Sequence, residues 1–277
     1  MRRLSLTLLL AGLASCAEAP LAASRAVVPP RAPAAVVPPA TEPAIPSQAA
    51  SPPAPTSSAV TPPPAAEPRP PPLLVPVPGD KPVRVALAPP GVDGVIVYFH
   101  GVCGDAEAFR AFERAALRFG TLISLSGDER CDTPGRFRWG LDVRNQRKRI
   151  GAAMDAVSLL RGAPLDRSRV VLVGYSQGAL RVEALGVAYP EEFPRLVAIA
   201  GPRAPHLDGF RKSHSIALVG GAWDLRSHLQ EGAAKLVHRG LRAEYTELPG
   251  ARHGQYGPEA ERVLGEVFTW LYAAPAP

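Results

Sequence analysis

The chain has 277 residues, 33 prolines and a formal net charge of +6. Twenty of the prolines fall between residues 20 and 78, so the compact part of the chain is shorter than its length suggests. About 190 residues remain, which is enough for one well-buried core. The sequence has no run of basic residues interleaved with aromatic residues. This argues against a nucleic-acid-binding protein, while the positive balance is weak evidence for an anionic surface nearby.

The N-terminus has the pattern of a secretory signal. Two arginines precede an apolar run from Leu4 to Leu13, which is too short to span a bilayer as a stable helix. The run ends in Leu-Ala-Ser-Cys, which resembles the lipobox of bacterial lipoproteins. This resemblance implies removal of residues 1–15, acylation of Cys16 and contact with the bacterial cell envelope through a lipid anchor only. The outer membrane is favoured; an ordinary signal peptide followed by secretion is the alternative.

Residues 16–80 are dominated by Ala, Pro, Val, Ser and Thr and carry few charges. Such a segment buries too little apolar surface to offset the entropy of ordering it. Dense proline favours an extended polyproline II conformation, a semi-rigid spacer of about 3.1 Å per residue. We therefore predict a disordered tether over residues 16–80 and one folded domain over residues 81–277. A tether that holds the domain away from a membrane and a spacer without a selected role both fit this composition.

The folded part alternates β-branched apolar runs with segments of helical spacing. This alternation predicts an α/β fold with a mostly parallel, doubly wound sheet, helices on both faces and right-handed crossovers. No insertion is long enough to be a large cap domain, so we expect an open site. Strands are predicted at 83–87, 95–99, 122–125, 170–173, 196–200, 216–219 and 242–248, and helices at 105–119, 145–160, after 178 and from about 258.

The segment Gly-Tyr-Ser-Gln-Gly at 174–178 lies between the buried strand 170–173 and a helix. A chain that reverses so sharply strains its central residue and crowds the positions two before and two after it, where glycine fits best. The turn is expected to lift the Ser176 hydroxyl clear of the sheet at the N-terminus of a helix. A tight strand-to-helix turn with an incidental serine is the alternative interpretation.

With this turn, a His-Gly pair after the strand 95–99 and a late Asp and His, residues 81–273 resemble the α/β-hydrolase family. The nearest resemblance is to compact esterases of the carboxylesterase, feruloyl-esterase and polyhydroxyalkanoate-depolymerase-like kind. It implies that the loop after the His-Gly pair supplies one oxyanion-hole amide, from Val102, and that Gln177 supplies the second. His100 itself is expected to hold the loop by hydrogen bonds.

A serine hydroxyl needs a base to remove its proton during attack, and histidine is suited to that task near neutral pH. The imidazole in turn needs a carboxylate that fixes its tautomer. Ser176, Asp224 and His253 occur in the order that the family implies, each just after a predicted strand. Asp208 remains an alternative acid, because some hydrolases place this residue one strand earlier.

These features predict a serine esterase that acts on a small-molecule carboxylic ester as a monomer, with no metal and no cofactor. A peptidase or thioesterase with the same triad is one alternative, and a lipoprotein that keeps the fold as a non-catalytic binding module is another. The polar crossover 127–142 contains Arg136, Phe137, Arg138 and Trp139. They are expected either to line an acyl pocket or to form a surface loop with the two aromatic residues packed beneath it. Arg252 beside His253 is a candidate contact for a substrate carboxylate.

Two cysteines, Cys103 and Cys131, remain once Cys16 is acylated, and export places them in an oxidising compartment. Cys103 follows Val102, and Cys131 lies a few residues beyond the next strand, which in hydrolases of this family pairs beside the first. Neighbouring strands are about 4.8 Å apart, so residues above their carboxyl ends can reach disulfide distance. We predict a disulfide that braces the oxyanion loop; two separate buried thiols are the alternative.

Overall fold

The computed structural model of the chain describes residues 69–273. The predicted signal segment 1–15, the lipidation site Cys16 and most of the predicted tether lie outside the described residues. In the part that is described, no helix combines the length and the apolar character that a membrane crossing needs.

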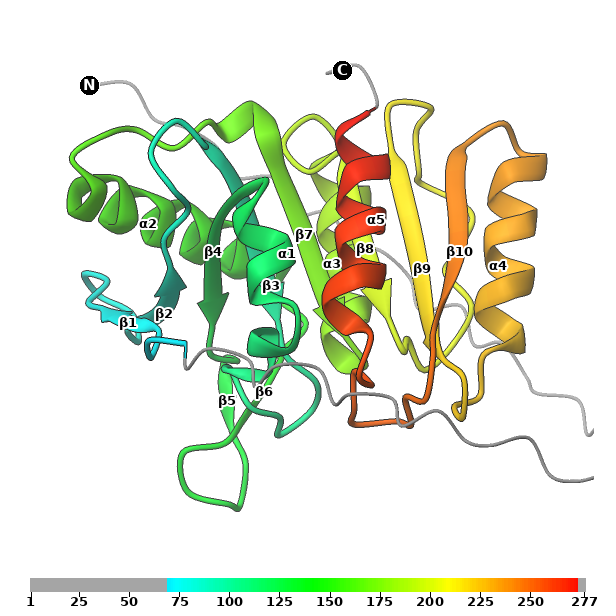
Figure 1. Ribbon diagram of the computed structural model, residues 1–277, viewed down its shortest axis with the longest axis horizontal. Helices are drawn as coiled ribbons and strands as arrows, with labels where there is room; N and C mark the ends of the chain where they lie inside the picture. The colour runs from blue at the N-terminus through cyan, green and yellow to red at the C-terminus, as the bar shows by residue number, and fades with distance from the viewer. Residues whose placement is uncertain (1–68, 274–277) are drawn as a thin grey trace, which may run out of the picture. The chain divides into compact units, whose positions relative to one another are not determined.

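Eight strands form one sheet in the order β1-β2-β4-β3-β7-β8-β9-β10. Pairing is parallel from β4 through to β10, and β1 and β2 add two antiparallel strands at one edge (Figure 1). The predicted mostly parallel sheet is therefore confirmed. The strands are β1 (Leu73–Val75), β2 (Val83–Ala86), β3 (Gly94–Phe99), β4 (Gly120–Leu125), β7 (Val170–Tyr175), β8 (Arg195–Ile199), β9 (Ser215–Gly221) and β10 (Arg242–Leu248).

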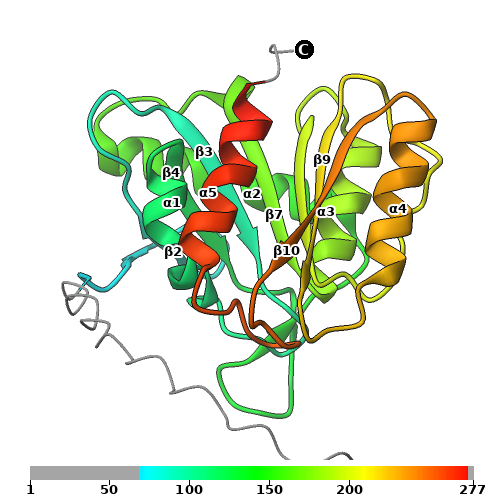
Figure 2. The same ribbon diagram turned by 45° about the vertical axis from the view of Figure 1, so that its right-hand side comes forward.

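Helices cover both faces of the sheet, as the alternation of elements predicts (Figures 1 and 2). One face packs against α1 (Glu113–Leu117) and α5 (Ala260–Tyr272). The other face packs against α2 (Val143–Arg161), α3 (Gln177–Ala188) and α4 (Ser227–His238). The central strands β3, β4 and β7 are buried along their whole length, which explains why their sequences are almost uninterrupted apolar runs.

The folded part begins earlier than residue 81, the boundary that we predicted. Leu73 pairs with Val85 and Val75 pairs with Val83, so β1 belongs to the sheet. We did not predict a strand at Leu-Leu-Val because the run is only three residues long and prolines flank it on both sides. Backbone pairing at the sheet edge and burial of Val75 hold this strand in place despite its proline-rich surroundings.

The single helix predicted over residues 105–119 is wrong. A 3₁₀ turn (Ala108–Ala111) and the short α1 take its place. The break at Phe112, with φ of −137°, allows Phe109 and Phe112 to be buried together against the Tyr98 ring, at centroid distances of 6.3 and 5.9 Å. Packing of aromatic rings therefore outweighs helical continuity at this point.

The crossover between β4 and α2, predicted to be irregular, contains a two-stranded hairpin of β5 (Glu129–Arg130) and β6 (Phe137–Arg138). This hairpin projects beyond the carboxyl edge of the main sheet, below β3 and β4 in Figure 1. The crossover ends where the Asp142 side chain accepts the Arg144 and Asn145 N–H groups and caps α2.

Candidate active site

Ser176 lies in the sharp turn between β7 and α3. Its φ of 52° is in the left-handed region that side chains rarely adopt. A Cβ added at Gly174 would overlap the Gly178 carbonyl, and a Cβ at Gly178 would overlap the Phe99 carbonyl. The two glycines are therefore required by the close approach of α3 to the ends of β7 and β3. This turn presents the Ser176 hydroxyl at the N-terminus of α3.

The structure brings Ser176, His253 and Asp224 together at the carboxyl edge of the sheet. Ser176 Oγ lies 3.2 Å from His253 Nε2, and His253 Nδ1 lies 2.8 Å from Asp224 Oδ2. A carboxylate oxygen only accepts, so Nδ1–H donates to Asp224 and Nε2 is free to accept the serine proton. Asp224 Oδ1 accepts the Leu225 N–H at 2.8 Å, which fixes the carboxylate against the chain.

Backbone contacts between two loops set the distance between the acid and the imidazole. Asp224 lies in the loop after β9, and His253 lies in the loop after β10. The Trp223 N–H donates to the Ala251 carbonyl at 2.9 Å, and the Ala222 N–H donates to the Leu248 carbonyl at 3.0 Å. The parallel pairing of β9 with β10 thus continues into the loops and keeps both side chains in register.

The alternative acid, Asp208, lies elsewhere. Its side chain is 94% exposed and pairs with Arg239 at 2.7 Å. Arg252, the candidate contact for a substrate carboxylate, is exposed beside His253. Within residues 69–273, no group of three or more His, Cys, Asp and Glu side chains is arranged to hold a metal ion.

Both residues named for the oxyanion hole lie beside Ser176. Val102, 56% exposed, joins Ser176 and His253 in the wall of a cavity of about 260 Å³. Gln177 is the first residue of α3. Among the described residues, neither the Val102 N–H nor the Gln177 N–H has a hydrogen-bond partner within the protein. Two unengaged amide donors next to a nucleophile are suited to stabilising negative charge.

Comparison with known proteins identifies the fold. No protein-family model and no curated relative matches the sequence. Esterase PE8 matches with a TM-score of 0.53 at 16% identity, over 72% of this chain and 100% of that chain. The chain has the α/β-hydrolase fold. Two carboxylesterases are also similar in structure. The one from Mesorhizobium loti has a TM-score of 0.52 at 18% identity, over 73% of this chain and 100% of that chain. The one from Bacillus cereus has a TM-score of 0.51 at 17% identity, over 68% of this chain and 92% of that chain.

In this α/β-hydrolase fold, the crossover 127–142 supports the loop that follows β3. Trp139, expected either in a pocket wall or beneath a loop, is only 3% exposed and packs on Phe99 at a centroid distance of 4.6 Å. Its indole N–H donates to the His100 carbonyl at 2.7 Å. Trp139 therefore packs beneath the loop, which is the second of the two expectations for this residue.

The Gln177 side chain has a role that the sequence did not reveal. Its Oε1 accepts the Trp139 N–H at 3.0 Å, and its Nε2 donates to the Trp139 carbonyl at 3.2 Å. The residue after Ser176 thus holds the backbone of the crossover on both sides of Trp139. Tyr175 acts in a similar way on the other side, since its hydroxyl accepts the Gly254 N–H at 2.5 Å, beside His253. Both partners are backbone groups distant in sequence, so no local motif signals either contact.

His100 is a structural residue, as expected, and its protonation state is fixed by its partners. The ring is 1% exposed. The Gly127 N–H can only donate, so Nε2, at 3.0 Å, is the unprotonated nitrogen, and Nδ1–H donates to the Gly101 carbonyl at 2.7 Å. Burial lowers the pKa of His100 below its usual value. Protonation of Nε2 would set two N–H groups against each other and remove this one hydrogen bond between the crossover and the His100 ring.

The predicted disulfide between Cys103 and Cys131 is present, with a Cα–Cα distance of 5.9 Å. It joins the residue after Val102 to the β5–β6 hairpin. Next to it, Gly104 forms an isolated antiparallel bridge with Phe137. The disulfide and the bridge together fix the position of the oxyanion loop against the hairpin.

We expect replacement of both Cys103 and Cys131 by alanine to lower the free energy of unfolding by about 3–4 kcal/mol, the chain-entropy value for a loop of this length. The midpoint of urea unfolding measures this change, and wild-type protein kept in reductant should behave like the double variant. An unchanged midpoint in both samples would show that the cross-link does not constrain the unfolded chain.

His100 also generates a pH dependence. Its pKa is lower in the folded state than in the unfolded chain, so between the two values the unfolded chain binds more protons and stability falls as the pH falls below about 6.5. The stability difference between wild type and His100→Asn should therefore be largest above this pH and should shrink in acid. Thermal unfolding of both proteins from pH 8 to pH 4.5 measures it; a difference that is constant across this range contradicts the assignment.

Proposed function

We propose that this protein is a serine hydrolase that cleaves a carboxylic ester through an acyl-enzyme intermediate. One observation carries the proposal: the hydrogen-bonded chain from Ser176 through His253 to Asp224, whose serine end opens on a cavity. The strained serine turn supports it, because strain of this kind is retained where it serves a site. Solved structures with the same fold include an esterase and a carboxylesterase, which agrees with this proposal.

The geometry suggests how the steps would proceed. The Ser176 oxygen attacks the ester carbonyl while His253 Nε2 takes the serine proton, and Asp224 stabilises the resulting imidazolium. The carbonyl oxygen becomes an oxyanion, which the Val102 and Gln177 N–H groups would bind; one such donor is worth about 2.7–4 kcal/mol of barrier in a protease where it was removed. His253 then protonates the departing alcohol. A water molecule then attacks the acyl-enzyme carbonyl while His253 takes one of its protons. The bond to the Ser176 oxygen breaks, His253 returns the proton to that oxygen, and the carboxylic acid is released.

Two other functions use the same residues. Peptidases and thioesterases employ an equivalent triad, and only the leaving group distinguishes them from esterases. A non-catalytic binding protein would need neither the tautomer-fixing contact at Asp224 nor two unengaged amide donors beside an activated serine. The combination of these features favours catalysis over simple binding. The choice of a carboxylic ester as the substrate rests on the resemblance of the sequence motifs to those of compact esterases.

Substitution of the triad should separate catalysis from folding. We expect Ser176→Ala and His253→Ala each to lower kcat/KM for a 4-nitrophenyl ester by at least about 10⁴-fold, because each removes a group that forms or breaks bonds. Asp224→Asn should be impaired, but less than the serine variant. Asp208→Asn is the matched control and should stay within about twofold of wild type, because its carboxylate contacts only a surface arginine.

Circular dichroism should show all four variants folded. If Asp224→Asn kept full activity and Asp208→Asn lost it, the acid would be Asp208 and our assignment of Asp224 would be wrong. A panel of acyl thioesters and peptides, run beside the nitrophenyl and phenolic esters, decides between the esterase and its two enzymatic rivals.

We further propose that Cys16 is acylated and tethers the domain to the bacterial cell envelope, with residues 17 to about 68 as the spacer. The lipobox-like segment before Cys16 supports this proposal. One acyl chain binds a membrane only reversibly, so several chains on one cysteine are needed for stable anchoring.

Expression in a bacterium that processes lipoproteins tests the anchor. Wild-type protein should partition into the detergent phase and incorporate labelled palmitate, and Cys16→Ser should lose both properties because it lacks the acceptor thiol. The Cys103→Ser variant serves as the control for loss of a cysteine and should still be labelled. Palmitate incorporation that persists in Cys16→Ser overturns the lipobox interpretation.

A further inference from the structure

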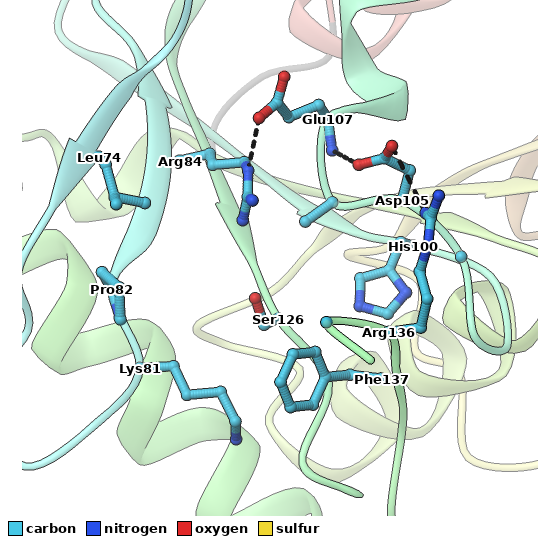
Figure 3. A pocket seen from close by; sticks show the side chains of 13 residues that line it. Leu74, Lys81, Pro82, Arg84, His100, Asp105, Glu107, Ser126, Arg136 and Phe137 are labelled. Atoms are coloured by element: carbon cyan, nitrogen blue, oxygen red, sulfur yellow. Dashed lines mark hydrogen bonds and ion pairs between the residues drawn. The ribbon is translucent and has the colours of Figure 1, made fainter. Parts of the chain in front are cut away.

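A second and larger cavity, of about 530 Å³, shares part of its lining with the cavity at Ser176; Figure 3 shows the second cavity. Gly104 and Asp105 line both cavities, so the oxyanion loop is the wall between them. The opposite wall comes from the end of β1 and the start of β2, and the β5–β6 hairpin closes the side at Phe137. The disulfide and the Gly104–Phe137 bridge hold this hairpin in place. The second cavity is therefore preformed, as ligand sites usually are.

Two polar side chains converge inside this cavity. The Arg84 Nε donates to the Glu107 carboxylate at 2.8 Å. Among the described residues, neither its terminal Nη groups nor the Ser126 hydroxyl has a hydrogen-bond partner within the protein. In Figure 3 the free end of Arg84 and the Ser126 oxygen point toward the same space.

The sheet register explains why Arg84 and Ser126 face each other. Arg84 on β2 pairs directly with Ser124 on β4. Ser126 is two residues further along, so it lies on the same side of the sheet as the diagonal neighbour of Arg84. A carboxylate that enters between them can accept a hydrogen bond from the guanidinium and another from the hydroxyl.

Lys81 adds a positive charge at the edge of the cavity. Its Nζ lies 5.0 Å from the centre of the Phe137 ring, and no carboxylate within the described residues forms an ion pair with it. The nearby carboxylates of Asp80 and Asp128 are both bound by Arg149, at 2.6 and 2.5 Å. Burial, followed by the charge of Arg149, lowers the pKa of Lys81. An ammonium group in this situation is stabilised by an anion that arrives from outside.

Both carboxylates that line the cavity already have an arginine partner. Asp105 pairs with Arg136 at 3.4 Å, and Glu107 pairs with Arg84. Three cations thus face two carboxylates, and the lining has one positive charge in excess. This balance fits a monoanion such as a carboxylate better than a phosphate dianion. Leu74, Pro82 and Phe137 supply apolar surface for the chain that carries the anion (Figure 3).

We propose that the second cavity is a subsite for a carboxylate at the remote end of the ester substrate, bound by Arg84 and Ser126 with Lys81 at the edge. The substrate class is then an ester that carries a free carboxylate, separated from the scissile bond by a carbon chain long enough to pass Gly104. This inference rests on the proposed ester hydrolysis at Ser176, because the substrate would have to extend from Ser176 across Gly104 and Asp105, which line both cavities.

Kinetics with paired esters test the subsite. The 4-nitrophenyl monoesters of dicarboxylic acids with four to ten carbons are compared with the same compounds capped as methyl esters. Wild type should prefer the free carboxylate by at least about tenfold in kcat/KM at the best chain length, mainly through KM, as expected for a hydrogen-bonded ion pair. Acetate esters of hydroxy acids place the carboxylate on the alcohol side and show which half of the substrate enters the cavity.

Variants locate the preference. Arg84→Met should bring the ratio of free to capped ester close to one, and Ser126→Ala should lower it by several-fold. Arg147→Met is the matched control, since Arg147 also pairs with a surface glutamate, Glu192, but lies on α2 away from the cavity. This variant should keep the wild-type ratio. Equal rates for free and capped esters at every chain length in wild type, in both the acyl-side and the alcohol-side series, would overturn the subsite.

A binding measurement keeps the two proposals separate. Backbone amide shifts of the Ser176→Ala variant are followed by NMR during titration with monomethyl adipate, dimethyl adipate and inorganic phosphate. The subsite predicts shifts near Arg84 and Ser126 with the monoester alone, which disappear when Arg84→Met is added. If Ser176→Ala shows this binding but wild-type protein hydrolyses none of the esters, the proposed function is refuted and the subsite is kept. Absence of these shifts, or equal shifts with phosphate, refutes a carboxylate subsite.

Discussion

The site depends on one steric constraint: α3 starts so close to the ends of β7 and β3 that neither Gly174 nor Gly178 can carry a side chain. The chain can reverse there only if Ser176 takes a left-handed conformation, and this conformation lifts its hydroxyl out of the sheet. The strain costs about 1–3 kcal/mol, and the surrounding buried strands supply the stability that maintains it. The serine is therefore presented by the backbone and does not depend on its own side-chain contacts.

A second layer of contacts then fixes everything around the serine. The crossover between β4 and α2 is attached to the oxyanion loop through the His100 ring, the Trp139 indole and the disulfide, and to the nucleophile turn through the Gln177 side chain. The imidazole is held from the other side by Tyr175 and by the backbone contacts between the loops after β9 and β10. Most of these contacts join a side chain to a backbone group, so they restrain the partner loop without requiring a particular side chain in it.

The sequence predicted the parts of this structure that local chemistry decides. The strands were predicted because their apolar runs have the length and β-branched character of buried parallel strands, and the serine turn because glycine spacing reports steric crowding. The disulfide followed from an even cysteine count and the expected neighbourhood of two strands. β1 was missed because three residues between prolines carry no periodicity, and the helix at 105–119 was wrong because the burial of Phe109 and Phe112 is decided by Tyr98, a distant partner. The contacts of the Gln177 side chain with Trp139 and the second cavity both depend on residues that are far apart in the sequence. No local sequence pattern therefore predicts them.

The strand order has a consequence for the order of assembly. β3 has β4 on one side and β7 on the other. Residues 94–125 contain both β3 and β4, so the first of these pairs can form while the C-terminal half of the chain is still being synthesised. The other edge of β3 stays open until residues 170–175 emerge. During that interval β3 is an apolar edge strand with unpaired backbone groups, which is the kind of surface that invites aggregation. The arrival of β7 closes this edge and brings the turn at Ser176 into place in the same step, so the covering of the open edge and the exposure of the Ser176 hydroxyl are coupled.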